Sequence, residues 1–200
     1  MPTSNSRAQA WTLLCEWTES DSLRRHMLAV EAAMRAYAPR FGGDVELWGL
    51  TGLLHDLDYE RHPDLDTGHP RYAMRELQEH GYPPQLVRAV ASHADFMNVP
   101  RETDMEKALF AVDELSGFIL ACAYVRPEGL AGMTPKSVKK KMKAPSFAAA
   151  VSRDDLRNGP AALGVDFDEH VEIVIAALAA HSDELLPPPP ADRASATPTS

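Results

Sequence analysis

The sequence predicts an all-α protein built around one main domain. Apolar residues recur at three- and four-residue steps in nearly every periodic segment, which is the spacing of a helix face. No alternating apolar and polar pattern long enough to indicate a strand occurs. The length of 200 residues and the 44% share of hydrophobic residues suit one globular core and exclude wholesale disorder.

The periodic segments define the expected helices in chain order. A stripe beginning at Leu23 and Met27 makes the first one amphipathic, whereas the next, over 45–57, is apolar nearly all round and is expected to be central and buried. Its Gly49 and Gly52 are unfavourable in a helix interior, which indicates that another backbone approaches closely there. We expect helices over residues 22–37, 45–57, 70–80, 83–93 and 104–124, a short basic helix opening at Thr134-Pro135, and a closing helix over 166–185.

The two ends of the chain are expected to lie outside the core. Residues 187–200 read PPPPADRASATPTS, and four prolines followed by small polar residues cannot build a core. We therefore expect a disordered tail over 187–200 and a flexible N-terminus over 1–7. The helical domain is expected over 8–186.

Charge and cysteine content narrow the function classes. The net charge of −9 argues against a general nucleic-acid or membrane-surface binder, so neither duplex nucleic acid nor a membrane is an expected partner. Cys15 and Cys122 lie far apart without metal-ligand spacing, which favours a reducing compartment. The sequence has no secretory-signal pattern and no apolar run of the ~20 residues that a membrane span needs. We expect a cytoplasmic protein; the oligomeric state is not indicated.

Histidine and aspartate residues occupy positions that should be apolar. His26, His55, Asp56, His93 and Asp113 lie on or beside apolar helix faces. Burying a polar group without a partner costs about 2–7 kcal/mol, so each of them needs a hydrogen-bond partner or a ligand. Singly, each has an ordinary structural explanation, such as a hydrogen-bonded core histidine or an aspartate paired with an arginine. Together they favour a divalent cation, because deprotonated carboxylates and neutral imidazoles are its ligands.

Several short motifs carry these residues in a fixed order. The motifs are RRHMLAVEAAM, GLLHDLDYE, GHPRYAM, SHAD and AVDELSGF, and they span about Ser22 to Tyr124. In this order and in a helical context they resemble the HD superfamily of metal-dependent phosphohydrolases. The resemblance implies a compact helical bundle over 22–124, to which residues 125–186 add further helices.

The resemblance also implies a set of metal ligands. It consists of two groups that share one carboxylate: His26, His55, Asp56 and Asp113 for a first ion, and Asp56, His69 and His93 for a second. His62 competes with His69 for this role, because the loop over 58–68 is short. Ser92-His93-Ala94 stands where binuclear members often have paired histidines, so one ion or two are both open. Nitrogen and oxygen ligands without thiolate suit Mn²⁺, Fe²⁺, Co²⁺, Ni²⁺ or Mg²⁺, with Zn²⁺ as a further candidate.

Charged residues close to the HD dipeptide are candidates for the chemistry. Asp56 would orient the attacking water, and Asp58 or Glu60 could exchange a proton with the reacting groups, unless both belong to a solvated loop. Arg61 and Arg71 flank the His69 loop and are the first candidates for binding a substrate anion.

Five of the six lysines lie within residues 136–143. Lys136 and Lys140 share one side of the expected helix and could close over a phosphate group. A solvated helix face is the alternative interpretation of the same run.

The sequence thus favours a metal-dependent phosphohydrolase, either a phosphomonoesterase or a phosphodiesterase. Bound metal lowers the pKa of water from about 15.7 to about 7, so no protein nucleophile is needed for attack on a small phosphorylated molecule such as a nucleotide. No GxSxG motif, reactive Cys/His pair or Gly-rich phosphate loop occurs. The alternatives are an HD-type di-iron oxygenase with the same ligands, and a non-catalytic helical module that binds a nucleotide or a protein partner.

Overall fold

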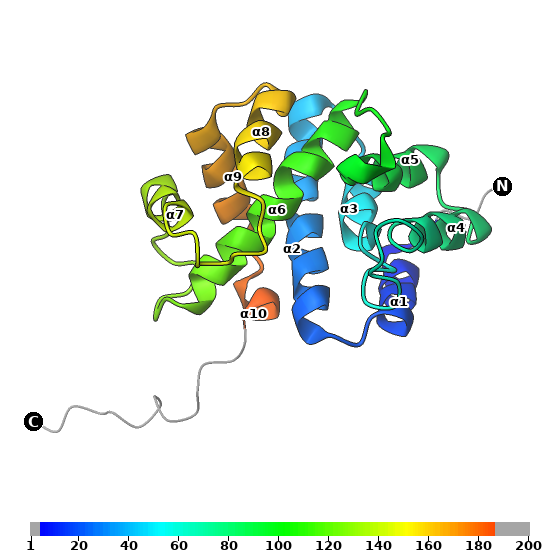
Figure 1. Cartoon of the computed structure of the whole chain (residues 1–200), viewed down its shortest axis with the longest axis horizontal. Coiled ribbons are helices and arrows are strands. Elements are labelled where there is room, and N and C mark those ends of the chain that lie inside the picture. Colours follow the sequence, from blue (N-terminus) through cyan, green and yellow to red (C-terminus); the bar gives the residue numbers. More distant parts are fainter. Residues whose placement is uncertain (1–4, 187–200) are drawn as a thin grey trace, which may run out of the picture.

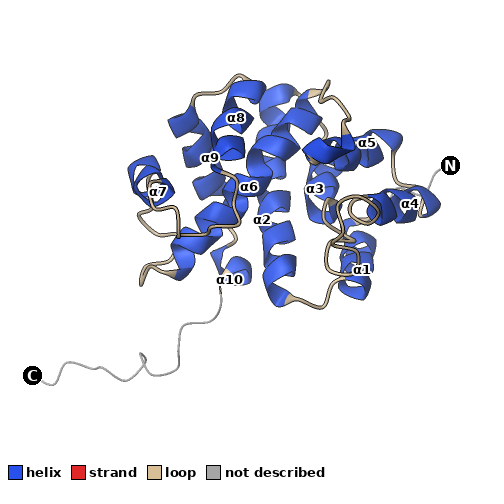
Figure 2. Ribbon diagram, viewed as in Figure 1, coloured by secondary structure: helices blue, strands red, loops and turns tan. Residues whose placement is uncertain are grey.

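The computed structural model describes residues 5–186, which form helices and loops without a strand (Figure 2). The expected all-α class is therefore confirmed. The expected tail over 187–200 lies outside the described residues, as do residues 1–4 of the expected flexible N-terminus. The helices are α1 (Arg7–Trp17), α2 (Asp21–Tyr37), α3 (Val45–Leu54), α4 (Arg71–Glu79), α5 (Pro84–His93), α6 (Asp104–Tyr124), α7 (Pro135–Met142), α8 (Arg153–Leu163), α9 (Phe167–Ala179) and α10 (Ser182–Leu185), with 3₁₀ turns η1 (Ala38–Phe41) and η2 (Asp95–Met97).

Helix α2 runs through the middle of the molecule and carries helices on both sides (Figure 1). On one side it packs against α3, with α1, α4 and α5 beyond, and these helices form one apolar core cluster. On the other side it packs against α6 and α9, which form a second cluster together with α7 and α8. None of the described helices is long and apolar enough to cross a bilayer.

The contact between α2 and α3 is close enough to require glycine. A Cβ atom added at Gly52 would lie 2.8 Å from the carbonyl oxygen of Val30 and 2.9 Å from the amide nitrogen of Glu31. The expected close approach of a backbone is thus confirmed at Gly52. At Gly49 the approaching group is instead the side chain of Arg35, at 2.6 Å.

We expect Gly52→Ala to lower the free energy of unfolding by about 1–3 kcal/mol, because the added methyl group meets rigid backbone atoms. Gly117→Ala is the matched control, since its Cβ would sit 3.5 Å from the nearest His26 atom, an ordinary contact. Removing this glycine from the middle of α6 should raise stability by about 0.5–1 kcal/mol. Urea unfolding of both metal-free proteins measures the difference. Equal stabilities would contradict a close packing of α2 on α3.

Some element boundaries differ from the sequence prediction. The helix expected over 45–57 ends at Leu54, and the one expected over 166–185 is divided into α9 and α10. Helices α1 and α8 were not predicted at all. Helix α8 contains Gly159 and Pro160, which normally indicate a break, yet Gly159 is needed because a Cβ there would lie 2.7 Å from the Cα of Ala111 on α6.

Candidate metal centre

The end of α3 brings His55 and Asp56 to one point. The helix stops at Leu54, and residues 55–61 continue as turns, so the two adjacent side chains are released from the 100° spacing of a regular helix. The other candidate ligands come from separate elements: His26 from α2, His69 from the loop before α4, His93 from the last residue of α5, and Asp113 from α6. Four helices therefore converge on the start of this turn.

Asp56 is shared between two groups of side chains. Its Oδ2 atom lies 3.8 Å from His26 Nε2 and 3.5 Å from His55 Nε2. Its Oδ1 atom lies 3.6 Å from His69 Nε2 and 3.5 Å from His93 Nε2. Each group has three ligand atoms within 4.8 Å of one another, which is close enough to hold one cation.

Asp113 completes the first group. Its Oδ1 atom lies 3.1 Å from His26 Nε2 and 3.3 Å from His55 Nε2. The structure therefore brings together all six residues that the family resemblance implies, in the two groups that it implies. Their role as ligands remains a proposal.

Hydrogen bonds fix the tautomers of three of these histidines. The Nδ1 atom of His55 donates to the Gly52 carbonyl at 2.8 Å, and that of His93 donates to the Val90 carbonyl at 2.6 Å. The Nδ1 atom of His69 faces Asp58 Oδ1 at 2.8 Å. Because carbonyl and carboxylate oxygens can only accept, the neutral form of each ring carries its proton on Nδ1 and directs the Nε2 lone pair at the cluster.

This arrangement fits a metal ion better than it fits the side chains alone. His69 Nε2 and His93 Nε2 lie 3.3 Å apart, and two unprotonated nitrogens cannot hydrogen bond to each other. His55 Nε2 is fully buried and has no hydrogen-bond partner among the described residues. A cation between each pair would satisfy these lone pairs, and the mixed imidazole and carboxylate set is typical of divalent metal sites.

The imidazoles and carboxylates of the cluster shift one another's pKa values towards the charged forms. Burial lowers the pKa of His55, but the carboxylates of Asp56 and Asp113 outweigh it and raise the pKa to about 9. In the metal-free protein His55 therefore also holds a proton on Nε2, and a cation must displace this proton in order to bind there. Burial raises the pKa of Asp56 and of Asp113, yet the facing imidazoles hold both pKa values below their usual range. Both carboxylates are thus ionised, as metal ligands must be.

Asp58 lies behind the cluster and does not face the pocket. Its side chain is fully buried, with Oδ1 bonded to His69 and Oδ2 accepting the amide proton of Ala73 at 2.8 Å. The proton-transfer role expected for Asp58 therefore has no geometric basis. The carboxylate instead fixes the orientation of the His69 ring and directs its Nε2 atom at the cluster.

We expect Asp58→Asn to weaken binding at the His69–His93 group by about 10–100-fold. The amide keeps one oxygen acceptor, so its NH₂ group must face either the Nδ1 proton of His69 or the amide proton of Ala73. Calorimetric titration of the metal-free protein with Mn²⁺ measures the effect. Retention of the wild-type affinity and stoichiometry would contradict this orienting role.

The structure also places Glu60 and Arg61 away from the cluster. Glu60 Oε2 accepts the amide protons of Glu19 and Ser20 at 2.9 and 3.1 Å, which ties the turn to the start of α2. Arg61 donates to the Glu16 carbonyl and lies 5.0 Å over the ring of Trp17. The proton-transfer role of Glu60 and the anion-binding role of Arg61 are thus not supported by their positions.

Arg71 and His62 belong to the loop rather than to the cluster. Arg71 donates to the Leu65 carbonyl at 2.9 Å and helps to hold the loop before α4. The ring of His62 stacks on Tyr72 with the ring centres 3.7 Å apart, so it does not compete with His69. Neither Arg71 nor His62 lines the pocket at the metal cluster.

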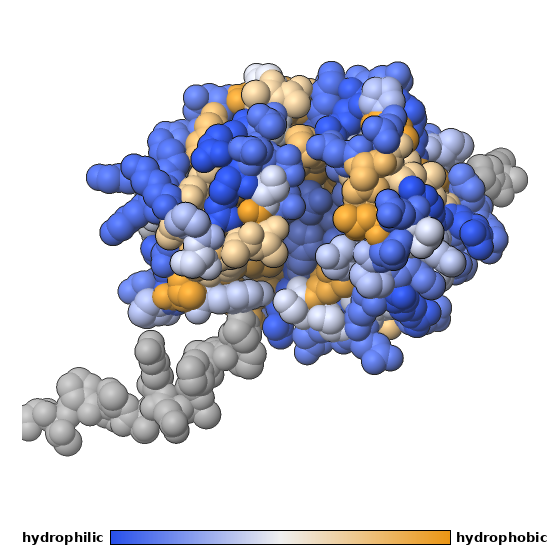
Figure 3. All heavy atoms as spheres, viewed as in Figure 1, coloured by the Kyte–Doolittle hydropathy of each residue, from blue (hydrophilic) through white to orange (hydrophobic). Residues whose placement is uncertain are grey.

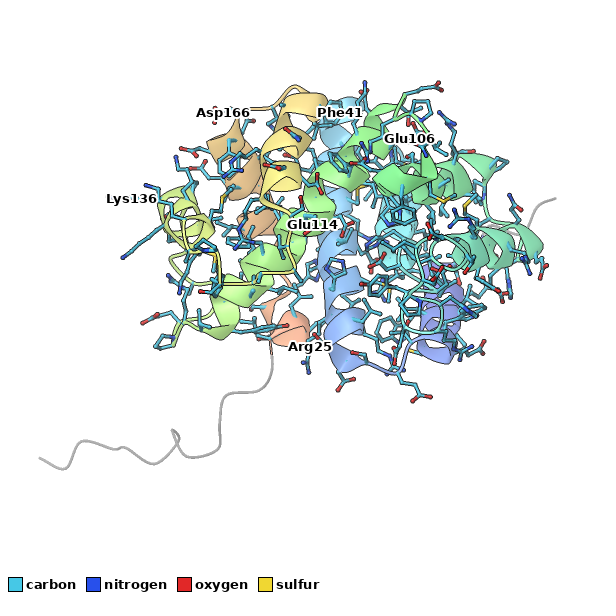
Figure 4. All side chains as sticks on the ribbon, viewed as in Figure 1. Arg25, Phe41, Glu106, Glu114, Lys136 and Asp166 are labelled. Carbon is cyan, nitrogen blue, oxygen red and sulfur yellow. The ribbon has the colours of Figure 1, made fainter. Side chains whose placement is uncertain are left out.

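Lys136 and Lys140 lie on α7, outside the same pocket. Figure 4 shows Lys136 at the outer edge of the molecule, whereas Glu114 lies on α6 near the middle of the same view. Lys139 of the same helix pairs with Asp168 of α9 at 2.8 Å. The expected closure of these lysines over a bound phosphate is therefore not supported by their positions.

A cavity of about 480 Å³ opens onto the cluster. Figure 3 shows a hollow near the middle of this face with apolar residues, in orange, on either side. The lining combines cluster residues with three further carboxylates and an apolar wall: Leu23, His26, Asp56, Tyr59, Leu65, His69, His93, Ala94, Asp95, Phe96, Phe110, Asp113, Glu114, Gly117, Ala150, Val151 and Asp155. This volume suits a small organic molecule.

One wall of the cavity is held in place by Arg153, a residue that no sequence pattern singles out. Its guanidinium group lies 4.7 Å over the ring of Phe118 and fixes the segment 144–151 by donating to the carbonyls of Ala144, Phe147, Ala148 and Val151. The segment brings Ala150 and Val151 to the rim. A single arginine after an irregular stretch gives no recognisable sequence signal for this role.

Glu114 and Asp155 are two further cavity residues that sequence reasoning missed. Burial, supported by the charges of Asp113 and Asp155, raises the pKa of Glu114 to about 7. Charged residues on helices usually face solvent, so nothing in the sequence distinguished these two from a solvated surface. Only the packing of α8 on α6 places both at the cavity.

Fold and site together define a helical protein whose histidine and aspartate side chains are positioned to bind divalent metal ions. Among protein families, the HD domain model matches residues 23–117, so the chain carries an HD domain. This range includes every side chain of the cluster. Comparisons with curated proteins and with solved structures give no match.

Proposed function

We propose that the protein is a metal-dependent phosphohydrolase that cleaves a phosphate ester of a small molecule. The observation that carries the proposal is the shared carboxylate of Asp56, which joins two groups of imidazoles at the floor of a cavity of about 480 Å³. The HD domain supports the same class, because HD domains bind divalent metals and many are hydrolases. The nucleotide expected from the sequence is one member of the substrate class.

The residues have distinct roles in this proposal. His26, His55 and Asp113 would hold one ion and His69 and His93 the other, with Asp56 contacting both. The donor set suits Mn²⁺, Fe²⁺, Co²⁺, Ni²⁺, Mg²⁺ or Zn²⁺. When bound, such a pair supplies an activated water and holds the phosphoryl oxygens.

The remaining chemistry follows from the cavity walls. No serine, threonine, cysteine or lysine lines the described cavity, so the proposed attacking group is water. Hydrolysis adds the water oxygen to phosphorus, breaks the bond from phosphorus to the ester oxygen, and moves one proton to the leaving alkoxide. A phosphomonoester then gives an alcohol and inorganic phosphate, whereas a phosphodiester gives an alcohol and a phosphomonoester. The apolar wall of Phe96, Phe110 and Val151 limits access of bulk water to the reacting centre.

A screen of metal-loaded protein tests the proposal. Protein stripped with a chelator and reloaded with Mn²⁺, Co²⁺, Ni²⁺ or Mg²⁺ is assayed with phosphomonoesters and phosphodiesters, with the stripped protein as the blank. We expect metal-dependent cleavage of one of these ester classes, followed by release of the alcohol, and a rise in thermal stability on metal loading. A Lys136→Ala, Lys140→Ala protein should match the wild type, because α7 lies outside the cavity. Absence of both bound metal and ester cleavage would overturn the proposal.

A further inference from the structure

The charge of the cavity is unusual for a site that binds phosphorylated molecules. Beyond the cluster, its described lining carries the carboxylates of Asp95, Glu114 and Asp155, and includes no lysine or arginine. The basic residues expected to hold a substrate anion lie elsewhere. Arg61 is bonded to Glu16, and Arg71 to the loop carbonyl of Leu65.

Two of the three carboxylates form no ion pair with another described residue. Asp95 is paired with Arg101, whereas Glu114 and Asp155 form no ion pair. Glu114 Oε2 accepts only the amide proton of Ser152, at 3.2 Å. These two side chains come from α6 and α8, which pack against each other, so they approach the cavity from the same side.

The floor and the wall of the cavity therefore favour groups of opposite charge. With ions bound, the floor at Asp56 is positive and attracts one phosphoryl group. The wall at Glu114 and Asp155 offers carboxyl oxygens and, among the described residues, no basic side chain. It disfavours further phosphates, because like charges at short range in a partly enclosed site are strongly unfavourable. The exposed rings of Tyr59 and Phe96 on the rim add apolar surface and π faces, which favour an organic cation.

We propose that the substrate carries a cationic amine at the end remote from the reacting phosphate, and that Glu114 and Asp155 bind this amine. The inference rests on the proposed phosphohydrolase function and narrows its substrate class to small aminoalkyl phosphate esters. It disfavours nucleoside diphosphates and triphosphates, whose additional phosphates would face the two carboxylates. Hydrolysis of such a substrate yields an amino alcohol and phosphate.

Paired probes that differ only in charge test the inference. Binding to Mn²⁺-loaded protein is measured by calorimetry with 3-aminopropylphosphonate and with butylphosphonate, a near-isosteric neutral-tailed analogue. We expect the amine to bind about tenfold more tightly or better, since it meets two unpaired carboxylates. In the Glu114→Gln, Asp155→Asn protein the ratio should fall to within about twofold. Asp154→Asn, a neighbouring exposed position on α8, should keep the wild-type ratio.

Hydrolysis of the matching esters, 3-aminopropyl phosphate and butyl phosphate, separates this inference from the proposed function. Tighter binding of the aminophosphonate together with faster hydrolysis of the amino ester supports the amine site and the phosphohydrolase function. If the two esters are cleaved with equal efficiency and the two phosphonates bind equally, the amine site is contradicted and the phosphohydrolase function is still supported. Preferential binding of the amine without cleavage of either ester supports the charge selectivity and contradicts the hydrolase. If the ratio of the two phosphonate affinities is unchanged in the Glu114→Gln, Asp155→Asn protein, the amine site is also contradicted. The metal content of each variant is measured in parallel, so that loss of metal is not mistaken for loss of the amine site.

Discussion

The Asp56→Asn protein is expected to lose phosphohydrolase activity by about a thousandfold or more. Asp56 is the one carboxylate that both groups share, with Oδ2 facing His26 and His55 and Oδ1 facing His69 and His93. A neutral amide offers one weaker oxygen ligand and an NH₂ group that cannot bind a cation. Bound ions contribute several kcal/mol to stabilising the charge that develops in transfer reactions, and each 1.36 kcal/mol is a factor of about ten in rate.

Metal content gives the second readout for this variant. We expect Asp56→Asn to retain clearly less metal than the wild type after dialysis, because each group loses its shared ligand. Glu79→Gln, an exposed position on α4, is the matched control and should retain both metal and activity. Far-ultraviolet circular dichroism verifies that the helices are intact. Wild-type activity in the Asp56→Asn protein would rule out the cluster as the catalytic site.

The second large effect concerns stability at low pH and depends on His170. This fully buried residue of α9 bonds to two other helices, accepting from the Tyr37 hydroxyl at 2.6 Å and donating through Nε2 to the Ala111 carbonyl at 3.0 Å. Because the Nε2 proton is directed at a carbonyl, Nδ1 must be the acceptor, and the ring is neutral. Burial lowers the pKa of His170 from 6.5 to about 4.

This shift predicts a loss of stability on acidification. Between pH 6.5 and about 4 the unfolded chain binds a proton at His170 that the folded protein does not, so the free energy of unfolding falls as the pH falls. The shift corresponds to about 3 kcal/mol at pH 4 relative to neutral pH. Urea unfolding of the metal-free protein across this range measures it.

A non-titrating variant isolates the contribution of His170 from that of the metal cluster, whose side chains also titrate. His170→Gln should be less stable than the wild type at pH 7, by about 1–3 kcal/mol, because the hydrogen bonds to Tyr37 and Ala111 are no longer both made. The wild type should lose about 3 kcal/mol relative to this variant as the pH falls from 6.5 to 4, so the stability gap closes or reverses. A gap independent of pH would show that His170 is protonated in the folded protein at higher pH than its burial implies.

The sequence was most informative where periodicity and chemistry agree. The stripe that begins at Leu23 predicted α2, and the all-round apolar segment from Val45 predicted the buried α3. Polar side chains on such faces stand out, so His26 and Asp113 could be recognised as candidates from their positions in the sequence. Their grouping around Asp56 came from the family resemblance, since spacing alone does not specify which helices meet.

Other parts of the site depend on tertiary contacts that local pattern does not encode. Asp58 and Glu60 look equivalent in the sequence, yet one is buried beneath His69 and the other binds the amides before α2. The Arg61 side chain packs over the ring of Trp17 on α1, a helix that was not predicted from the sequence, and this contact directs it away from the cluster. Glu114 and Asp155 lie 41 positions apart in the numbering and become neighbours of one cavity only because α8 packs on α6.

The division of the core into two clusters has a consequence for how the protein opens. His26 and Asp113 belong to α2 and α6, whereas His55, His69 and His93 extend from α3, the loop before α4, and α5 on the other side. An ion held by His26, His55, Asp56 and Asp113 would act as a cross-link that must break before the two halves can separate. Metal loading should therefore slow amide hydrogen exchange in α3 and α6 together and lengthen the lifetime of the folded state against proteolysis.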